Sequence, residues 1–329
     1  MSYFNTFESL ENSKILWDKF EKTTPTSNLF LTFEWFNLLL NYQAKLPKLN
    51  ILILQNKEND IEGIAPLIQT GKTITFFGDS NICDYQDFLV APNKSSVFFA
   101  HLIDYLIKKN WDNIFLEDIP ENSTTLTTFI NLCKKNNWNI NISEQNICPE
   151  IRLTNTWEKY LLSLQKKQRH EARRKINNLI KTKNYSWEIL ETEKINNESL
   201  KTFLNLAKKS SDEKKAFFSS SYINLFEQIF TKLKKNSILK LSFLNINGVP
   251  AASNIMFDYE NKRMLYNSGF NPEFKNLSVG IINTYFCIKD AIEKKFDSFD
   301  FLKGNEDYKF RLGANKITKV YTIKITKNN

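Results

Sequence analysis

The stretch FDFLKGNEDYKFRLG, residues 299–313, gathers residue types that could act on a negatively charged group. A short apolar run ends at Lys303-Gly304, an acidic patch follows, and Tyr308, Lys309 and Arg311 then come within four residues. The pattern has two interpretations. It is either the rim of a site for an anion or a capped short helix with surface charges.

A second concentration of charge lies in KKQRHEARRKINNLIKTK, residues 166–183, which holds eight basic side chains and one acidic one. The whole chain has a formal net charge of +9, so most of the excess lies in this one predicted helix. With a single acid there is little i,i+4 pairing to offset the repulsion, and an anionic partner would relieve it. We therefore predict anion binding by Lys166, Arg169, Arg173 and Arg174, and by Lys303 at the corner. The alternative is a solvated helix face.

A third candidate is KNLSVGIINTYF, residues 275–286, at the start of a predicted helix. Ser278 can cap the helix, and Gly280 lets a ligand approach the backbone. The unpaired N–H groups and partial positive charge of a helix N-terminus suit a pyrophosphate. The alternative is a cap with a purely structural role.

Composition excludes several other classes of function. The chain has 329 residues, 42% hydrophobic and 25% charged, which is typical of globular proteins and long enough for two domains. Its four cysteines show no C-x-x-C spacing, so we expect reduced, buried thiols and no metal site. With two histidines, no Ser-His or Cys-His pair is indicated. We find no Walker loop or dinucleotide fingerprint. No export signal or membrane span is visible, so we expect a cytoplasmic protein.

The elements that would position these residues fall into two similar halves. The first half is predicted to contain helices at 7–21, 33–43, 95–109 and 123–136, and strands at 49–55, 61–68, 72–77, 85–90, 113–118, 137–143 and 150–153. The second is predicted to contain helices at 156–182, 196–209, 220–235, 278–295 and 305–311, and strands at 186–193, 238–246, 249–258, 262–268, 297–302 and 317–326.

The order of elements is the same in both halves: three antiparallel strands, a helix, a strand, a helix and a strand. The offset between corresponding elements stays at about 185–190 residues, which indicates a tandem duplication. This order describes an α/β protein with a mixed α+β sheet that splits where antiparallel pairing gives way to parallel pairing. We place the domains at residues 1–153 and 154–329.

The ordered set of segments resembles the tandem GNAT family of acyl-CoA N-acyltransferases. The similarity is to its cellulose-biosynthesis-type acetyltransferase (CelD/BcsL-like) branch, which is related to the FemAB/FemX aminoacyl transferases. It is carried by FLTFEWFNLLLNY (30–42), GDSNICDYQDFLVAP (78–92), SLQKKQRHEARRKINNL (163–179), NGVPAASNIMFDYENKRMLYNSGFNPEFKNLSVG (247–280) and FDFLKGNEDYKFRLG. The family commonly has Asp-Pro at Asn271-Pro272 and Ser-Pro-Gly at Ser278-Val279-Gly280. The fuller Gln/Arg-x-x-Gly-x-Gly/Ala signature is missing.

The resemblance implies two tandem GNAT-like domains and transfer of an acyl group, usually acetyl, to an amine by direct attack. The donor would be acyl-CoA (acetyl-CoA), a co-substrate and not a tightly bound cofactor. The second domain would bind this donor through Ser268, Gly269, Leu277, Ser278, Val279 and Gly280. The first would serve the acceptor side or the structure.

The same resemblance implies four catalytic residues. Asp84 and Tyr85 match a recurrent Asp-Tyr, and a carboxylate there could orient or deprotonate the acceptor ammonium. Tyr308 and Lys309 match the family's Tyr-Lys. The tyrosine hydroxyl could protonate the departing thiolate and the lysine could stabilise developing negative charge. The alternatives are an aspartate turn and a capped helix, respectively.

The expected partners are acyl-CoA and an amine-bearing small molecule, sugar or cell-envelope precursor, with an anionic acceptor or membrane surface meeting residues 166–183. Two other functions remain open. A FemAB/FemX-like transferase would take its donor from aminoacyl-tRNA, which is the only nucleic acid that we expect as a partner. A degenerate GNAT scaffold would bind anions without catalysis. The sequence does not identify the acceptor or the acyl group.

Overall fold

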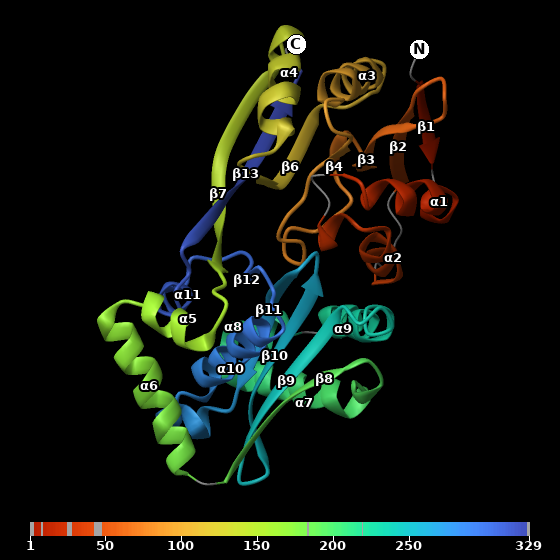
Figure 1. Ribbon diagram of the computed structural model, residues 1–329. Coiled ribbons are helices and arrows are strands. Elements are labelled where there is room, and N and C mark those ends of the chain that lie inside the picture. Colours follow the sequence, from red (N-terminus) through yellow and green to blue (C-terminus); the bar gives the residue numbers. More distant parts are fainter. Residues whose placement is uncertain are drawn as a thin grey trace. The chain divides into compact units, whose positions relative to one another are not determined.

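A computed structural model (Figure 1) describes residues 3–7, 9–24, 28–42, 48–182, 184–218 and 220–327. The chain forms two compact units. Unit 1 comprises Met1–Ile147 and Thr318–Asn329, and unit 2 comprises Cys148–Ile317. The chain passes from unit 1 to unit 2 after residue 147 and returns to unit 1 at residue 318, whereas the predicted domains are residues 1–153 and 154–329.

Unit 1 is built on a mixed sheet with strand order β1-β2-β3-β4-β6-β13-β7. The first four strands pair antiparallel, and β4 then pairs parallel with β6. Its elements are β1 (Tyr3–Phe7), α1 (Leu10–Glu21), the 3-10 helix η1 (Leu29–Leu31), α2 (Phe33–Tyr42), β2 (Lys48–Gln55), β3 (Ile61–Thr70), β4 (Thr73–Phe76), β5 (Leu89–Val90), α3 (Ser95–Ile107), β6 (Asn113–Pro120), the π-helix η2 (Thr125–Phe129), α4 (Ile130–Lys135), β7 (Asn139–Arg152) and β13 (Lys316–Thr326).

Unit 2 repeats this plan. Its strand order is β8-β9-β10-β11-β12, with the end of β7 beside β12. Its elements are α5 (Trp157–Ser163), α6 (Lys166–Lys181), β8 (Tyr185–Glu191), η3 (Thr192–Lys194), α7 (Asn197–Ser210), α8 (Asp212–Phe217), α9 (Ser220–Lys232), β9 (Leu239–Ile246), β10 (Val249–Tyr259), β11 (Lys262–Phe270), η4 (Pro272–Leu277), α10 (Val279–Glu293), β12 (Ser298–Asp300) and α11 (Asp307–Arg311).

The predicted duplication is present in the fold. In unit 1 the strands β2, β3 and β4 are followed by α3 and by β6, which pairs parallel with β4. In unit 2 the strands β9, β10 and β11 are followed by α10 and by β12, which pairs parallel with β11. The turn Asn247-Gly248 joins β9 to β10 with both residues at positive φ (50° and 77°), as its sequence indicates.

The structure differs from the predicted elements at several points. The single helix expected over 156–182 is broken between α5 and α6, where Leu164 is extended (ψ 148°). The two strands expected at 137–143 and 150–153 are one strand, β7. The strand β1 and the short helix α8 are not among the predicted elements. The last strand, β13, joins unit 1 because it pairs with β6 and buries Ile323 and Ile325 in that unit's core.

Two helices cover opposite faces of the unit 2 sheet at the end of β11. A Cβ added at Gly269 would collide with the backbone of α7, whereas one added at Gly280 of α10 would touch Phe270. Since neighbouring residues of a strand point to opposite faces, α7 and α10 lie on opposite sides of β11. In the described part of the chain, no helix has both the length and the apolar character that crossing a membrane requires.

Candidate active site

Strands β11 and β12 separate after a short parallel ladder, and the candidate site lies at this split in unit 2. The ladder joins residues 262–264 to residues 298–300 and ends there. On the other side of β11, the register of its pairing with β10 shifts: Ile255 faces Asn267, but the next residue, Met256, faces Leu265. Tyr266 is therefore the extra residue of a bulge. The far half of β11 therefore presents a strand edge that β12 does not cover.

Two side chains occupy this edge at Ser268. The backbone N–H of Ser268 donates to Asn267 Oδ1 (2.8 Å). The carbonyl of Ser268 accepts a hydrogen bond from Lys214 Nζ, which also lies 3.2 Å from Ser268 Oγ. Lys214 comes from α8, and burial lowers its pKa to about 8 although nearby Glu306 acts in the opposite direction. A half-buried lysine therefore stands at the split.

Lys309 organises the 301–306 loop, which connects β12 to α11. Its side chain is 2% exposed, and Nζ donates to the carbonyls of Leu302 (3.2 Å), Lys303 (2.9 Å) and Gly304 (3.1 Å). It also pairs with Glu306 Oε2 at 2.9 Å. An ammonium has three N–H groups, and these partners use all of them. The prediction that Lys309 meets developing negative charge is therefore corrected: in this structure it holds the loop.

The same loop is strained. Leu302 has φ 57° and Gly304 has φ 128°, conformations that most side chains disfavour. A Cβ at Gly304 would come within 2.9 Å of Lys309 Nζ. Glycine and a buried lysine are thus both needed to turn the chain between β12 and α11. Lys303, predicted to bind anions, is half-buried here, and its carbonyl is one of those that Lys309 binds.

Tyr308 lies beside Lys309 and keeps the properties of a proton donor. Its ring packs edge-on against Phe301, with ring centroids 6.2 Å apart. Burial, and to a smaller degree the charge of Glu306, raises the pKa of Tyr308 well above its usual range. The phenol consequently remains protonated at neutral pH.

The N-terminus of α10 is arranged differently from the prediction. Ser278 is the N-cap residue in the left-handed conformation (φ 56°), but its side chain makes no capping hydrogen bond. Instead, Ser278 Oγ accepts a hydrogen bond from Lys175 Nζ at 2.8 Å. Val279 is buried and Leu277 half-buried in an apolar cluster, so only their backbone could meet a ligand. A lysine of α6 thus adds positive charge to the unpaired N–H groups of the first helical turn.

The basic helix α6 divides its charges between internal contacts and solvent. Arg169 Nη1 donates to the carbonyls of Leu162 (3.1 Å) and Leu164 (3.2 Å) at the end of α5. Arg174 pairs with Glu171 at 2.9 Å. These two predicted anion-binding residues therefore have partners within the chain, although Arg174, like Lys166 and Arg173, is exposed.

The predicted Asp84 and Tyr85 belong to unit 1, so the four predicted catalytic residues fall in two units. Both side chains are half-buried, and the ring of Tyr85 lies 6.4 Å from that of Phe30. The other acid of this motif, Asp87, is 2% exposed and accepts hydrogen bonds from Thr125 Oγ1 (2.5 Å) and the Phe88 N–H (2.9 Å). Burial raises the pKa of Asp87 to about 6. Asp87 therefore ties the segment that carries Asp84 and Tyr85 to η2.

Gly269 is needed for packing, which explains its place better than the predicted donor contact does. An added Cβ would lie 2.6 Å from both Leu206 C and Ala207 Cα of α7. We expect the Gly269→Ala variant to lose about 1–3 kcal/mol of unfolding free energy, because two backbones that pack directly must separate. Urea unfolding would measure this. Gly280→Ala, where the nearest atom is 3.6 Å from the added Cβ, is the matched control. Equal stability of both variants would contradict the packing role.

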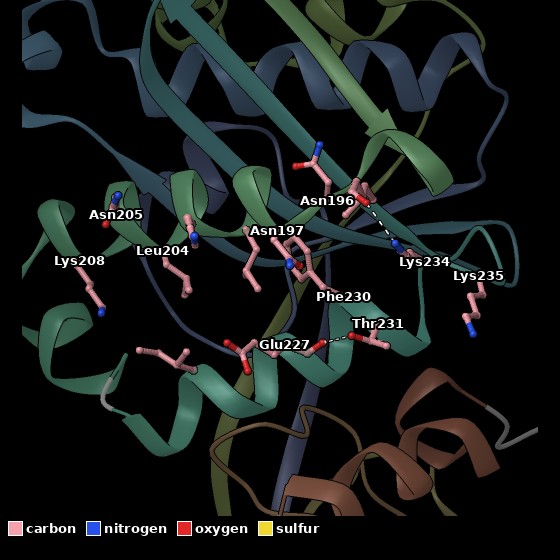
Figure 2. A pocket seen from close by; sticks show the side chains of 14 residues that line it. Asn196, Asn197, Leu204, Asn205, Lys208, Glu227, Phe230, Thr231, Lys234 and Lys235 are labelled. Atoms are coloured by element: carbon pink, nitrogen blue, oxygen red, sulfur yellow. Dashed lines mark hydrogen bonds between the residues drawn. The ribbon is translucent and has the colours of Figure 1, made fainter.

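A concave region away from the split lies in unit 2 between α7 and α9 (Figure 2), with a cavity volume of about 900 Å³. Four lysines and one carboxylate line it: Lys201, Lys208, Lys234, Lys235 and Glu227. Its apolar floor is already almost covered, since Leu200, Leu204 and Phe230 are 5%, 8% and 5% exposed. A ligand would gain little apolar burial there, and none of the predicted site residues lies in this groove.

Lys214 and Lys175 are the site residues that sequence reasoning missed. Lys214 stands in SSDEKKAFF, which has the appearance of a solvated surface turn, and its burial depends on β11, which lies far away in the chain. Lys175 is one of eight basic residues in the run, and only the docking of α6 on α10 selects it. The run itself was a signal for the region, although not for the residue.

Known proteins resemble the chain in sequence over part of unit 2 and in fold over nearly its whole length. Residues 166–310 match the family described as "Acetyltransferase (GNAT) domain". That range contains the split, α10 and the 301–306 loop. No curated protein matches the chain at a significant level.

Several solved structures share the fold. FemX is 12% identical with a TM-score of 0.65, covering 99% of this chain and 98% of that chain. The C-terminal domain of a putative lysylphosphatidylglycerol synthetase from Agrobacterium fabrum is 8% identical with a TM-score of 0.60, covering 98% and 93%. A tandem GNAT protein from the clavulanic acid biosynthesis pathway is 9% identical with a TM-score of 0.54, covering 100% of both chains. The fold is therefore that of a mixed α/β protein with two GNAT-like domains.

Proposed function

We propose that unit 2 is an N-acyltransferase that moves an acyl group, most simply acetyl, from acyl-CoA to an amine by direct attack. The observation that carries this proposal is the split between β11 and β12, with the N-terminus of α10 following it, inside the range that matches the acetyltransferase domain. A strand edge that can pair with amides and a helix N-terminus that can bind phosphate suit the two parts of such a donor.

Each part of the site has a role in this proposal. The N-terminus of α10 and Lys175 bind the donor's pyrophosphate, with the backbone of Leu277, Val279 and Gly280 in reach of it. A backbone N–H near the bulge of β11 polarises the acyl carbonyl. Acyl-CoA supplies the activated thioester. Tyr308, the tyrosine that the family resemblance implies, donates its proton to the departing thiolate.

Direct attack is favoured over a covalent acyl-enzyme by the state of the cysteines. All four cysteines of the chain are buried. Burial raises the pKa of Cys287, the cysteine of α10, to about 11, so it is a poor nucleophile at neutral pH. The acceptor amine itself then attacks the thioester carbon.

Further parts of the proposal rest on the family resemblance. We place acceptor recognition in unit 1, with Asp84 and Tyr85 orienting an amine of a small molecule, sugar or cell-envelope precursor. We assign the chain to the CelD/BcsL-like branch, with acetyl-CoA as its donor and the cytoplasm as its location.

A substitution in the first turn of α10 tests the donor site. We expect Gly280→Asp to reduce CoA affinity at least about 100-fold, because it places a carboxylate against the phosphates. Gly280→Ala, whose Cβ fits at ordinary contact distance, should bind CoA as the wild type does. Calorimetric titration with CoA measures both. Unchanged affinity in Gly280→Asp would remove the donor site from α10.

The donor class is tested by thermal shift with acetyl-CoA, free CoA and bulk tRNA. A ligand at 100 times its dissociation constant stabilises the folded protein by about 2.7 kcal/mol. Stabilisation by the CoA species alone supports the proposal. Stabilisation by neither CoA nor tRNA would overturn it and leave a non-catalytic scaffold.

An aminoacyl-tRNA-dependent transfer is the second candidate, favoured by the structural likeness to FemX and by the exposed cations of α6. Lys166, Lys167 and Arg173 are exposed on that helix. Stabilisation by tRNA that falls steeply with salt, without a response to CoA, would support this candidate instead.

A further inference from the structure

We propose that Lys214 is the catalytic residue that takes the proton from the acceptor amine at the split. This inference rests on the proposed function and adds a group to it. An amine in water is an ammonium and must lose a proton before it can attack a thioester. Asp84, the base implied by the family resemblance, lies in unit 1, whereas the strand edge and the 301–306 loop lie in unit 2. A base that belongs to unit 2 would be held against this edge by the fold of the unit itself.

The position of Lys214 is set by the unpaired edge of β11. Its Nζ donates to the carbonyl of Ser268 and lies 3.2 Å from Ser268 Oγ, beyond the point where β12 stops pairing. The reacting atoms of donor and acceptor must come within about 3–3.5 Å of one another. A donor bound along this edge would therefore present its thioester close to the amine of Lys214.

The chemistry of a neutral lysine suits this place. A neutral amine keeps two N–H groups, which can remain on the carbonyl and hydroxyl of Ser268, and it has one lone pair that can accept a proton. Burial lowers the pKa of Lys214 to about 8, so a useful fraction is neutral near physiological pH. Among the elements packed against Lys214, the charged group that faces it is Glu306, whose carboxylate favours the ammonium form of the lysine. Its neighbours Asp212, Glu213 and Lys215 on α8, and Lys209 on α7, are exposed.

Other groups at the split are less suited to accept the proton. Tyr308 keeps its own proton because burial raises its pKa. The three N–H groups of Lys309 are used by the loop carbonyls and Glu306. Of the two histidines, His101 is half-buried on α3 of unit 1 and His170 is exposed on α6.

Two protons leave the acceptor nitrogen in this step. The acceptor ammonium transfers the first to the neutral amine of Lys214, and the resulting acceptor amine attacks the thioester carbon. The new C–N bond forms as the C–S bond breaks. The second proton of the nitrogen replaces the one that Tyr308 gives to the departing thiolate, so that CoA leaves as a thiol, and Lys214 returns its proton to water.

The first test follows the titration of Lys214 and does not depend on activity. The full-length protein is exposed to a small amount of acetic anhydride across pH 6–11, and acetylation of each lysine is read by peptide mass spectrometry. We expect the modification of Lys214 to rise with a midpoint near about 8, below the ordinary lysine value of about 10.4. A midpoint for Lys214 at the ordinary lysine value would overturn the proposal.

The second test removes the amine. We expect Lys214→Met to lower transfer about 100-fold or more, measured as release of the CoA thiol with a panel of amines, while the thermal shift with CoA persists. Lys214→Arg, which cannot lose its proton, should also fail, and Lys215→Met on the same helix should behave as wild type. Aminoethylation of a Lys214→Cys variant restores an amine, and because the native cysteines are buried the label is selective.

The outcomes distinguish a failure of the role of Lys214 from a failure of the proposed acyltransferase function. Full transfer by Lys214→Arg with an unchanged pH profile would overturn the role of Lys214 and leave the acyltransferase intact. A wild-type protein that does not respond to CoA would overturn the proposed function, whatever the titration of Lys214.

Discussion

The Arg263→Met variant is expected to lose about 3–5 kcal/mol of unfolding free energy, because it removes the buried guanidinium that two carboxylates share. Asp290 keeps the more exposed Lys294 at 3.5 Å. Arg263 is 0% exposed in β11, at the base of the split. Its guanidinium binds Asp258 through Nε (2.8 Å) and Nη2 (2.9 Å), and Asp290 of α10 through Nη1 (2.5 Å). These contacts raise the pKa of Arg263 above its usual range. The ion pairs tie β10, β11 and α10 together.

Two control variants separate this effect from a general loss of charge. Arg263→Lys keeps the charge but cannot form the fork of hydrogen bonds, so its loss should be smaller. Lys289→Met removes an exposed ion pair with Glu293 (3.7 Å) on α10, and should cost less than about 1 kcal/mol. Urea unfolding measures all three variants. A stable Arg263→Met protein would mean that the triad contributes specificity and not stability.

The Lys309→Met variant is expected to reduce transfer about 100-fold or more, since the 301–306 loop would no longer be held in its conformation. Three carbonyls would lose their donor at once, and each buried unsatisfied acceptor costs about 1–3 kcal/mol. The positive φ of Leu302 would then relax. Tyr308 is carried by the same loop and helix, so its hydroxyl would shift from the leaving group.

The measurements for Lys309 combine function with local stability. CoA thiol release reports transfer, and hydrogen exchange over residues 302–306 reports the loop. Lys309→Arg should fail like Lys309→Met, because a planar fork cannot meet three converging carbonyls. Arg311→Met on the same helix is the control, since its pair with Asp307 is 73% and 86% exposed. Normal transfer together with rapid exchange in the loop would show that the loop conformation is dispensable.

Much of the fold follows from local sequence patterns. The three-strand runs of each half, the Asn247-Gly248 hairpin and the offset between the halves predict the repeated units, because alternation and turn residues are local signals. The break at Leu164 was missed because nothing in that segment is a strong helix breaker. The continuity of β7 was missed because the strand runs through a polar stretch and Pro149, which favour a break. The pairing of β13 with β6 was also beyond reach, since strand partners are selected by contacts distant in the chain.

At the candidate site, the sequence located the regions and the tertiary structure decided which residues matter. Composition and spacing indicated the corner at 299–313, the basic run and the start of α10. Folding then used Arg169 and Arg174 in local contacts, turned Lys309 inward onto carbonyls, and placed Lys175 on Ser278. It also buried Lys214 against the edge of β11. The physical reason is that a residue's type fixes the charge it can carry, whereas burial and hydrogen-bond partners, which come from distant segments, determine its pKa and its role.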